Sequence, residues 1–114
     1  MKLSYNLMPP SFQNIQPIAL ASERAGLHSI AVADSPLISR ELFVSCAECL
    51  RETKSLNVMT AVTNPLTRHP SVAASAIATL CEMAPGRILI GIATGDSAAW
   101  GAGCLLYTSD AADE

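Results

Sequence analysis

Short apolar runs alternate along the chain with segments whose apolar residues recur every three or four positions. Three runs occupy residues 30–33 (IAVA), 58–62 (VMTAV) and 88–93 (ILIGIA), and a further strand is expected near Lys2. The expected strands open near residues 2, 29, 57 and 87, so their starts are 27, 28 and 30 residues apart. Nearly continuous apolar runs are typical of strands covered on both faces, and strands that alternate with helices favour a parallel sheet.

The segments between the runs have a helical period. Each carries one apolar stripe: Ile18, Ala21 and Ala25 in the first, with Ile15 at its edge; Phe43, Ala47 and Leu50 in the second; Ala73, Ile77 and Leu80 in the third. Pro70 suits the first turn of the third helix, and Pro85 with Gly86 ends it. We expect each stripe to face the sheet.

Four such β-α units would form either the N-terminal half of a TIM (β/α)8 barrel or a small doubly wound sheet. Eight units of this length would reach roughly 230 residues, close to the typical barrel of about 250. The turn at residues 8–12 (MPPSF) contains no glycine, whereas a dinucleotide-binding sheet carries G-x-G-x-x-G after its first strand. We therefore predict an α/β fold that is the N-terminal half of a barrel, with the doubly wound sheet as the alternative.

The composition indicates a folded protein, because 50% of its 114 residues are hydrophobic and only 15% are charged. No stretch reaches the roughly 18 apolar residues of a membrane span. The first six residues lack the continuous apolar region of a secretion signal. The net charge is −3 and the seven basic residues are scattered, so no basic face is offered to nucleic acid. We expect a cytoplasmic protein that binds neither membrane nor nucleic acid.

The cysteines and histidines argue against disulfides and metal. Cys46 and Cys49 form a C-x-x-C inside a predicted helix, without a second pair, so we expect core packing rather than zinc binding. With Cys81 they make an odd set that does not suit a disulfide framework. His28 and His69 have no matching ligand spacing, so no metal site is predicted.

The end of the chain differs in character from the rest. Residues 104–114 (CLLYTSDAADE) resemble the in-frame translation of an adapter used to prepare DNA for sequencing. We therefore expect one domain over residues 1–103 and a non-native segment over residues 104–114. The alternative is an ordinary polar tail.

In a β-α barrel the active site gathers at the carboxyl ends of the strands. The residues at the expected strand exits are Asn6; Asp34 and Ser35; Thr63, Asn64, Arg68 and His69; Thr94, Gly95, Asp96 and Ser97. Two carboxylates in one apolar mouth disfavour each other's ionisation, so Asp34 or Asp96 could hold a proton and act as an acid. The alternative is that both are turn or cap residues. Arg68 would meet an anionic substrate or remain a solvated charge, and His69 would be catalytic or, more simply, a packing or capping residue.

Several segments are similar to those of the luciferase-like monooxygenase family. They are residues 61–70 (AVTNPLTRHP), 74–80 (ASAIATL), 85–87 (PGR) and 91–96 (GIATGD). Within the family, the chain resembles the branch that contains methylenetetrahydromethanopterin reductase, which uses the deazaflavin coenzyme F420. The similarity covers residues 1 to about 98.

The resemblance implies an eight-unit barrel that binds FMN or coenzyme F420 at its mouth and passes hydride between the ring and a small-molecule substrate. It also implies a homo-oligomer of complete barrels. A non-prolyl cis peptide at Ala61–Val62 would back one face of the ring, and Thr63 and Asn64 would line its polar edge. The cofactor-binding set is completed by Gly95.

The implied catalytic residues are Asp34, Asp96 and Asn6. Asn6 stands where the reductase branch usually has Glu, and an amide cannot give or take a proton as a carboxyl does. The substrate therefore stays open, as does the choice between FMN and the deazaflavin.

Three functions remain for testing. The first is a fragment of a flavin- or deazaflavin-dependent oxidoreductase or monooxygenase, with little or no turnover alone because half of the mouth is missing. The second is a non-catalytic half-barrel that binds a partner through its open sheet edges. The third is a small nucleotide-binding domain, which a strand order other than 1-2-3-4 would favour.

Overall fold

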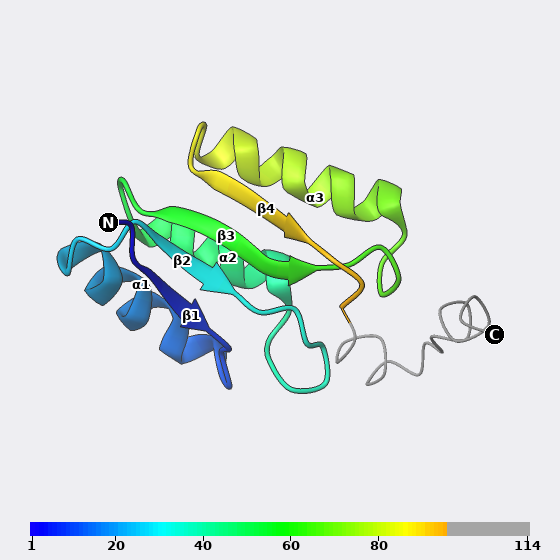
Figure 1. The fold of residues 1–114 in the computed structure, drawn as a ribbon, viewed down its shortest axis with the longest axis horizontal. Helices are drawn as coiled ribbons and strands as arrows, with labels where there is room; N and C mark the ends of the chain where they lie inside the picture. Colours follow the sequence, from blue (N-terminus) through cyan, green and yellow to red (C-terminus); the bar gives the residue numbers. More distant parts are fainter. Residues whose placement is uncertain (96–114) are drawn as a thin grey trace.

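The computed structural model describes residues 1–95, which form a layer of helices on a parallel sheet (Figure 1). The elements in chain order are β1 (Ser4–Leu7), the short 3-10 helix η1 (Phe12–Asn14), α1 (Ile15–Arg24), β2 (Ser29–Val32), α2 (Leu42–Glu52), β3 (Asn57–Thr63), α3 (Pro70–Met83) and β4 (Ile88–Ile92). All four predicted strands and all three predicted helices are confirmed. Asp96, Ser97 and the segment 104–114, for which the sequence carried predictions, lie outside the described residues.

The sheet is parallel throughout, with the strand order β1-β2-β3-β4. Ser4 lies opposite Ser29, and Ser29 lies opposite Asn57, so the strands begin almost level with one another. The helices follow one another along the same face of the sheet (Figure 1). This order is that of consecutive units in a barrel, so the predicted half-barrel is confirmed. A doubly wound sheet would have a different strand order, so that alternative is not supported.

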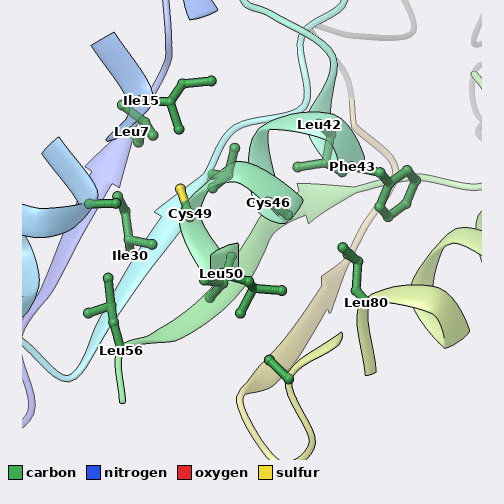
Figure 2. Close-up of a cluster of buried hydrophobic side chains, with 14 residues drawn as sticks. Leu7, Ile15, Ile30, Leu42, Phe43, Cys46, Cys49, Leu50, Leu56 and Leu80 are labelled. Atoms are coloured by element: carbon green, nitrogen blue, oxygen red, sulfur yellow. The ribbon is translucent and has the colours of Figure 1, made fainter. Parts of the chain in front are cut away.

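The hydrophobic core lies between the sheet and the helices, with α2 at its centre (Figure 2). Its fully buried side chains include Ile15, Ile30, Leu42, Leu56, Val58, Cys46 and Cys49. The predicted packing role of the C-x-x-C is therefore confirmed. Burial raises the pKa of the Cys46 thiol, and it raises the pKa of Cys49 to about 12.

The predicted stripe of α1 is confirmed for Ile15 and Ile18 and wrong for Ala21 and Ala25. Ile15, Ala19 and Ser22 are buried and Ile18 packs against the core, whereas Ala21 and Ala25 are exposed. Ser22 is buried without cost because its hydroxyl donates to the carbonyl of Ile18 at 2.8 Å. A pattern that counts only apolar residues overlooks such a serine. It therefore assigns the buried face of the helix to neighbouring positions.

The two outer strands are more exposed than the inner ones. β2 is buried along its whole length, but in β4 the side chains of Leu89, Ile90 and Ile92 are 39%, 42% and 65% exposed. The expectation of burial on both faces thus holds for β2 and fails for β4. β4 has no further strand beside it among residues 1–95, and these three side chains stay partly exposed while Ile88 packs against the core. None of the helices described in residues 1–95 is long and apolar enough to cross a membrane.

Candidate active site

The carboxyl ends of the four strands surround one hollow of about 520 Å³. It is lined by Asn6, Met8, Ala33, Asp34, Ser35, Ala61, Val62, Ala93, Thr94 and Gly95. A smaller hollow of about 270 Å³ lies between Tyr5 and α1 and has almost entirely apolar walls. We take the first as the candidate site, because it lies where barrel enzymes place their chemistry and contains polar groups.

Most of the residues predicted for the site meet at this hollow. Seven of them line it directly: Asn6, Asp34, Ser35, Ala61, Val62, Thr94 and Gly95. Thr63 and Asn64 are buried just beyond its wall, with 2% and 1% of their surfaces exposed. Asp96 lies outside the described residues.

Asp34 is held by three hydrogen bonds at the end of β2. The hydroxyl of Thr63 donates to Oδ2 at 3.0 Å, and Arg68 donates to Oδ2 from Nη1 at 2.7 Å and to Oδ1 from Nη2 at 3.2 Å. Only 1% of the Asp34 side chain is exposed. Paired charge and hydrogen bonds favour a buried carboxylate over a buried carboxylic acid. The bonds therefore hold the carboxylate group in one orientation. Asp34 is not the cap of α2, because Glu41 fills that position.

Arg68 lies neither free in solvent nor directed at the hollow. Its Nη2 also donates to Glu41 Oε1 at 2.7 Å, and its guanidinium carbon lies 4.8 Å from the centre of the Phe43 ring. Burial by itself lowers the pKa of Arg68, but the hydrogen bonds and charges of Asp34 and Glu41 outweigh it and raise the pKa above its ordinary value. Arg68 is thus a permanent cation that joins three segments.

Asn64 shapes the loop after β3. Its Oδ1 accepts from the backbone N–H groups of Leu66 and Thr67, both at 2.9 Å, and from the Thr67 hydroxyl at 3.2 Å. Its Nδ2 is buried and has no hydrogen-bond partner among the described residues. Buried donors are almost always paired in folded proteins, so this N–H group suits an acceptor supplied by a ligand.

The end of β3 is irregular. The pairing of β3 with β4 shifts its register between Thr60 and Thr63, and the peptide bond between Ala61 and Val62 is cis, as the resemblance implied. Val62 is 40% exposed and lines the hollow. Val62 therefore presents an apolar side chain to the site.

His69 has the capping role that the sequence left as the simpler alternative. It is the N-cap of α3, and its Nδ1 accepts from the backbone N–H of Ser71 at 3.2 Å and lies 2.7 Å from the Ser71 hydroxyl. Within residues 1–95, no group of three histidine, cysteine or acidic side chains is placed to hold a metal ion.

Comparison with known proteins gives a family match over most of the chain. A sequence model of the luciferase-like monooxygenase family matches residues 2–102. The chain is 30% identical to 5,10-methylenetetrahydromethanopterin reductase of Methanolobus tindarius over 84 residues, which are 74% of this chain and 26% of that protein. It is 31% identical over 107 residues to F420-dependent glucose-6-phosphate dehydrogenase of Gordonia bronchialis, covering 85% of this chain and 32% of that protein.

Solved structures share the fold. The coenzyme F420 dependent tetrahydromethanopterin reductase of Methanopyrus kandleri superposes with a TM-score of 0.83 at 26% identity, over 93% of this chain and 30% of that chain. The oxygenating constituent of 3,6-diketocamphane monooxygenase from Pseudomonas putida was solved in complex with FMN. It superposes with a TM-score of 0.75 at 18% identity, over 99% of this chain and 35% of that chain. The chain thus spans about a quarter to a third of these proteins.

Proposed function

The chain belongs to the luciferase-like monooxygenase family, and from this premise we propose that it is the N-terminal half of the barrel of an FMN- or coenzyme F420-dependent oxidoreductase. The complete enzyme would transfer hydride between the cofactor ring and a small organic substrate. Its relatives include an F420-dependent reductase and an F420-dependent dehydrogenase. The proposal keeps the expected cytoplasmic location and the pairing of complete barrels.

The hollow at the strand ends carries the proposal, because its walls fit a planar ring with polar edges. Ala61, Val62 and Ala93 supply apolar surface for a ring face. Asn64 has a buried donor without a partner, which suits a ring carbonyl oxygen or another acceptor. Gly95 keeps the neighbouring wall free of a side chain. When bound, the ring supplies the hydride chemistry that no amino-acid side chain provides.

Asp34 and Asn6 would bind and orient a ligand, and Asp96 would be the acid of this half. Asp34, paired with Arg68, would accept a hydrogen bond from an N–H or O–H group. Asn6 would orient a ligand through its amide, which can donate and accept but cannot transfer a proton. Asp96 stays the proposed acid of this half, on the basis of its place in the GIATGD segment.

The exposed edge strands support a longer protein. Leu89, Ile90 and Ile92 on β4 need cover, which a fifth strand of the same barrel would give. The same surface also favours the second candidate function, a half-barrel that binds a separate partner. A monomeric, cooperatively melting version of residues 1–103 would argue against a need for such a partner.

The proposed function is tested with a longer protein that begins with these residues and continues through the remaining barrel units. We expect it to bind FMN or F420 with an altered absorbance spectrum, and the 114-residue chain to show little or no turnover. Failure of the longer protein to bind either cofactor would sink the proposal. Flavin-dependent oxidation by the short chain itself would contradict the half-barrel.

A further inference from the structure

Arg68 contacts the site only through another residue. Its guanidinium reaches from the loop after β3 to Asp34 at the end of β2 and to Glu41 at the start of α2. Glu41 in turn accepts from the backbone N–H of Val44 at 2.7 Å, which caps α2. One cation therefore ties together the two loops that follow neighbouring strands.

The contact geometry determines what Asp34 offers to the hollow. Oδ2 already accepts from Thr63 and from Arg68, at 3.0 and 2.7 Å. Among residues 1–95, Arg68 is the one donor to Oδ1, at 3.2 Å, so this oxygen keeps acceptor capacity. Asp34 lines the hollow, and of its two carboxylate oxygens Oδ1 is the one with more capacity to accept a further hydrogen bond.

Removing the guanidinium would change the position of that oxygen. Asp34 would be left almost fully buried with the Thr63 hydroxyl as its donor, which is costly for a carboxylate. Its side chain would then turn away from its present position. The planar fork of arginine prevents this, because two parallel contacts hold the orientation of the carboxylate.

We propose that Arg68 is a positioning residue that acts through Asp34: it fixes Asp34 as an oriented anion whose Oδ1 accepts a hydrogen bond from an N–H or O–H group of the bound cofactor. The inference rests on the proposed function. Arg68 itself does not line the hollow. An indirect role of this kind appears when the effects of two substitutions on cofactor affinity are not additive, and it does not appear in the effect of either substitution alone.

The experiment measures cofactor dissociation constants by fluorescence titration in the longer protein, with the cofactor that the wild type binds. The variants are Arg68→Met, Asp34→Asn, the double variant and Arg68→Lys. We expect Arg68→Met to weaken binding about tenfold, and the double variant to bind no more weakly than Asp34→Asn. Lysine keeps the charge but loses the fork, so Arg68→Lys should recover part of the affinity.

The matched control is Arg51→Met. Arg51 lies on α2, is 65% exposed and pairs with Glu48 and Glu52 away from the hollow, so its loss should leave affinity unchanged. Unchanged affinity in Arg68→Met, or losses that multiply in the double variant, would overturn the inference while the proposed function stands. A wild type that binds neither cofactor would instead sink the proposed function. If Arg68→Met does not fold, the same cycle is run with Arg68→Lys.

Discussion

Gly95 and Asn64 lie so close that a Cβ atom on Gly95 would be 2.7 Å from the Cβ of Asn64 and 2.9 Å from its Nδ2. Asn64 has little freedom to move away, because it is buried and its Oδ1 holds the loop that follows β3. Gly95 also has a φ of +67°, which favours glycine. Absence of a side chain at residue 95 is therefore a condition for the position of Asn64.

Gly95→Ala should destabilise the protein and weaken cofactor binding. The left-handed backbone costs an alanine about 1 kcal/mol, and displacement of Asn64 should add about 1–3 kcal/mol. The matched control is Gly86→Ala, since Gly86 has a φ of +75° but nothing within 4 Å of an added Cβ. Urea unfolding of both variants separates the two costs, and equal destabilisation would show that Asn64 moves aside freely.

A second prediction concerns Thr60, which supports β4 at the point where the register shifts. Its buried hydroxyl accepts from the backbone N–H of Gly91 at 2.9 Å and donates to the carbonyl of Gly91 at 2.8 Å. Thr60→Val keeps the shape but removes both bonds, and should cost about 1–3 kcal/mol of unfolding free energy.

Thr60→Ser serves as the control for this substitution. Serine keeps the hydroxyl and loses only a methyl group, so it should be clearly more stable than Thr60→Val in the same urea titration. The reverse order would mean that packing of the methyl group, and not the paired hydrogen bonds, supports the β3–β4 contact.

The fold was predictable because the apolar runs and the turn residues agree. The run at residues 88–93 and the stop formed by Pro85 and Gly86 both indicate a strand after a helix, and β4 begins at Ile88. The buried face of α1 was not predictable in the same way. Ser22 counts as polar in the sequence, but its hydroxyl is satisfied within the helix.

The candidate site was predictable as a set of strand exits but not as a set of contacts. Arg68 and Asp34 are 34 residues apart, and local spacing carries no information about their pairing. The cap of α2 was missed because the side chain that fills it is Glu41, a residue type less typical of N-caps than Ser, Thr, Asp or Asn. The family resemblance pointed to Asn64 and Gly95 as cofactor-binding residues, but their mutual contact came only from the structure.

The thiols provide a third prediction, on reactivity. Cys46 and Cys49 are buried, and the raised pKa values leave almost no thiolate at neutral pH, whereas Cys81 is exposed on α3. In a Cys104→Ser background, a thiol reagent should label Cys81 quickly and the other two only on unfolding. Cys81→Ser should abolish the fast reaction. Fast labelling that persists would show that the α2 core opens in the native state.

The last prediction concerns Glu23 on α1, whose carboxylate holds the turn between α2 and β3. Its Oε1 accepts from the backbone N–H groups of Ser55, Lys54 and Leu56, at 2.7, 2.8 and 3.1 Å. These bonds, that of Ser55 foremost, favour the charged form and lower the pKa of Glu23 from 4.5 to about 2.

The lowered pKa predicts a pH dependence of stability with a definite sign. The unfolded chain takes up the proton near pH 4.5 and the folded chain only near pH 2, so the contribution of Glu23 is complete above 4.5 and is lost as pH falls toward 2. Glu23→Gln should therefore be less stable than wild type at about pH 7. The difference in unfolding free energy between the two proteins should become smaller toward about pH 3. Urea midpoints measured across this range test it. Glu82→Gln, on the exposed face of α3, should show no such narrowing. A gap for Glu23→Gln that stays constant with pH would mean that the turn is held by the shape of the side chain and not by its charge.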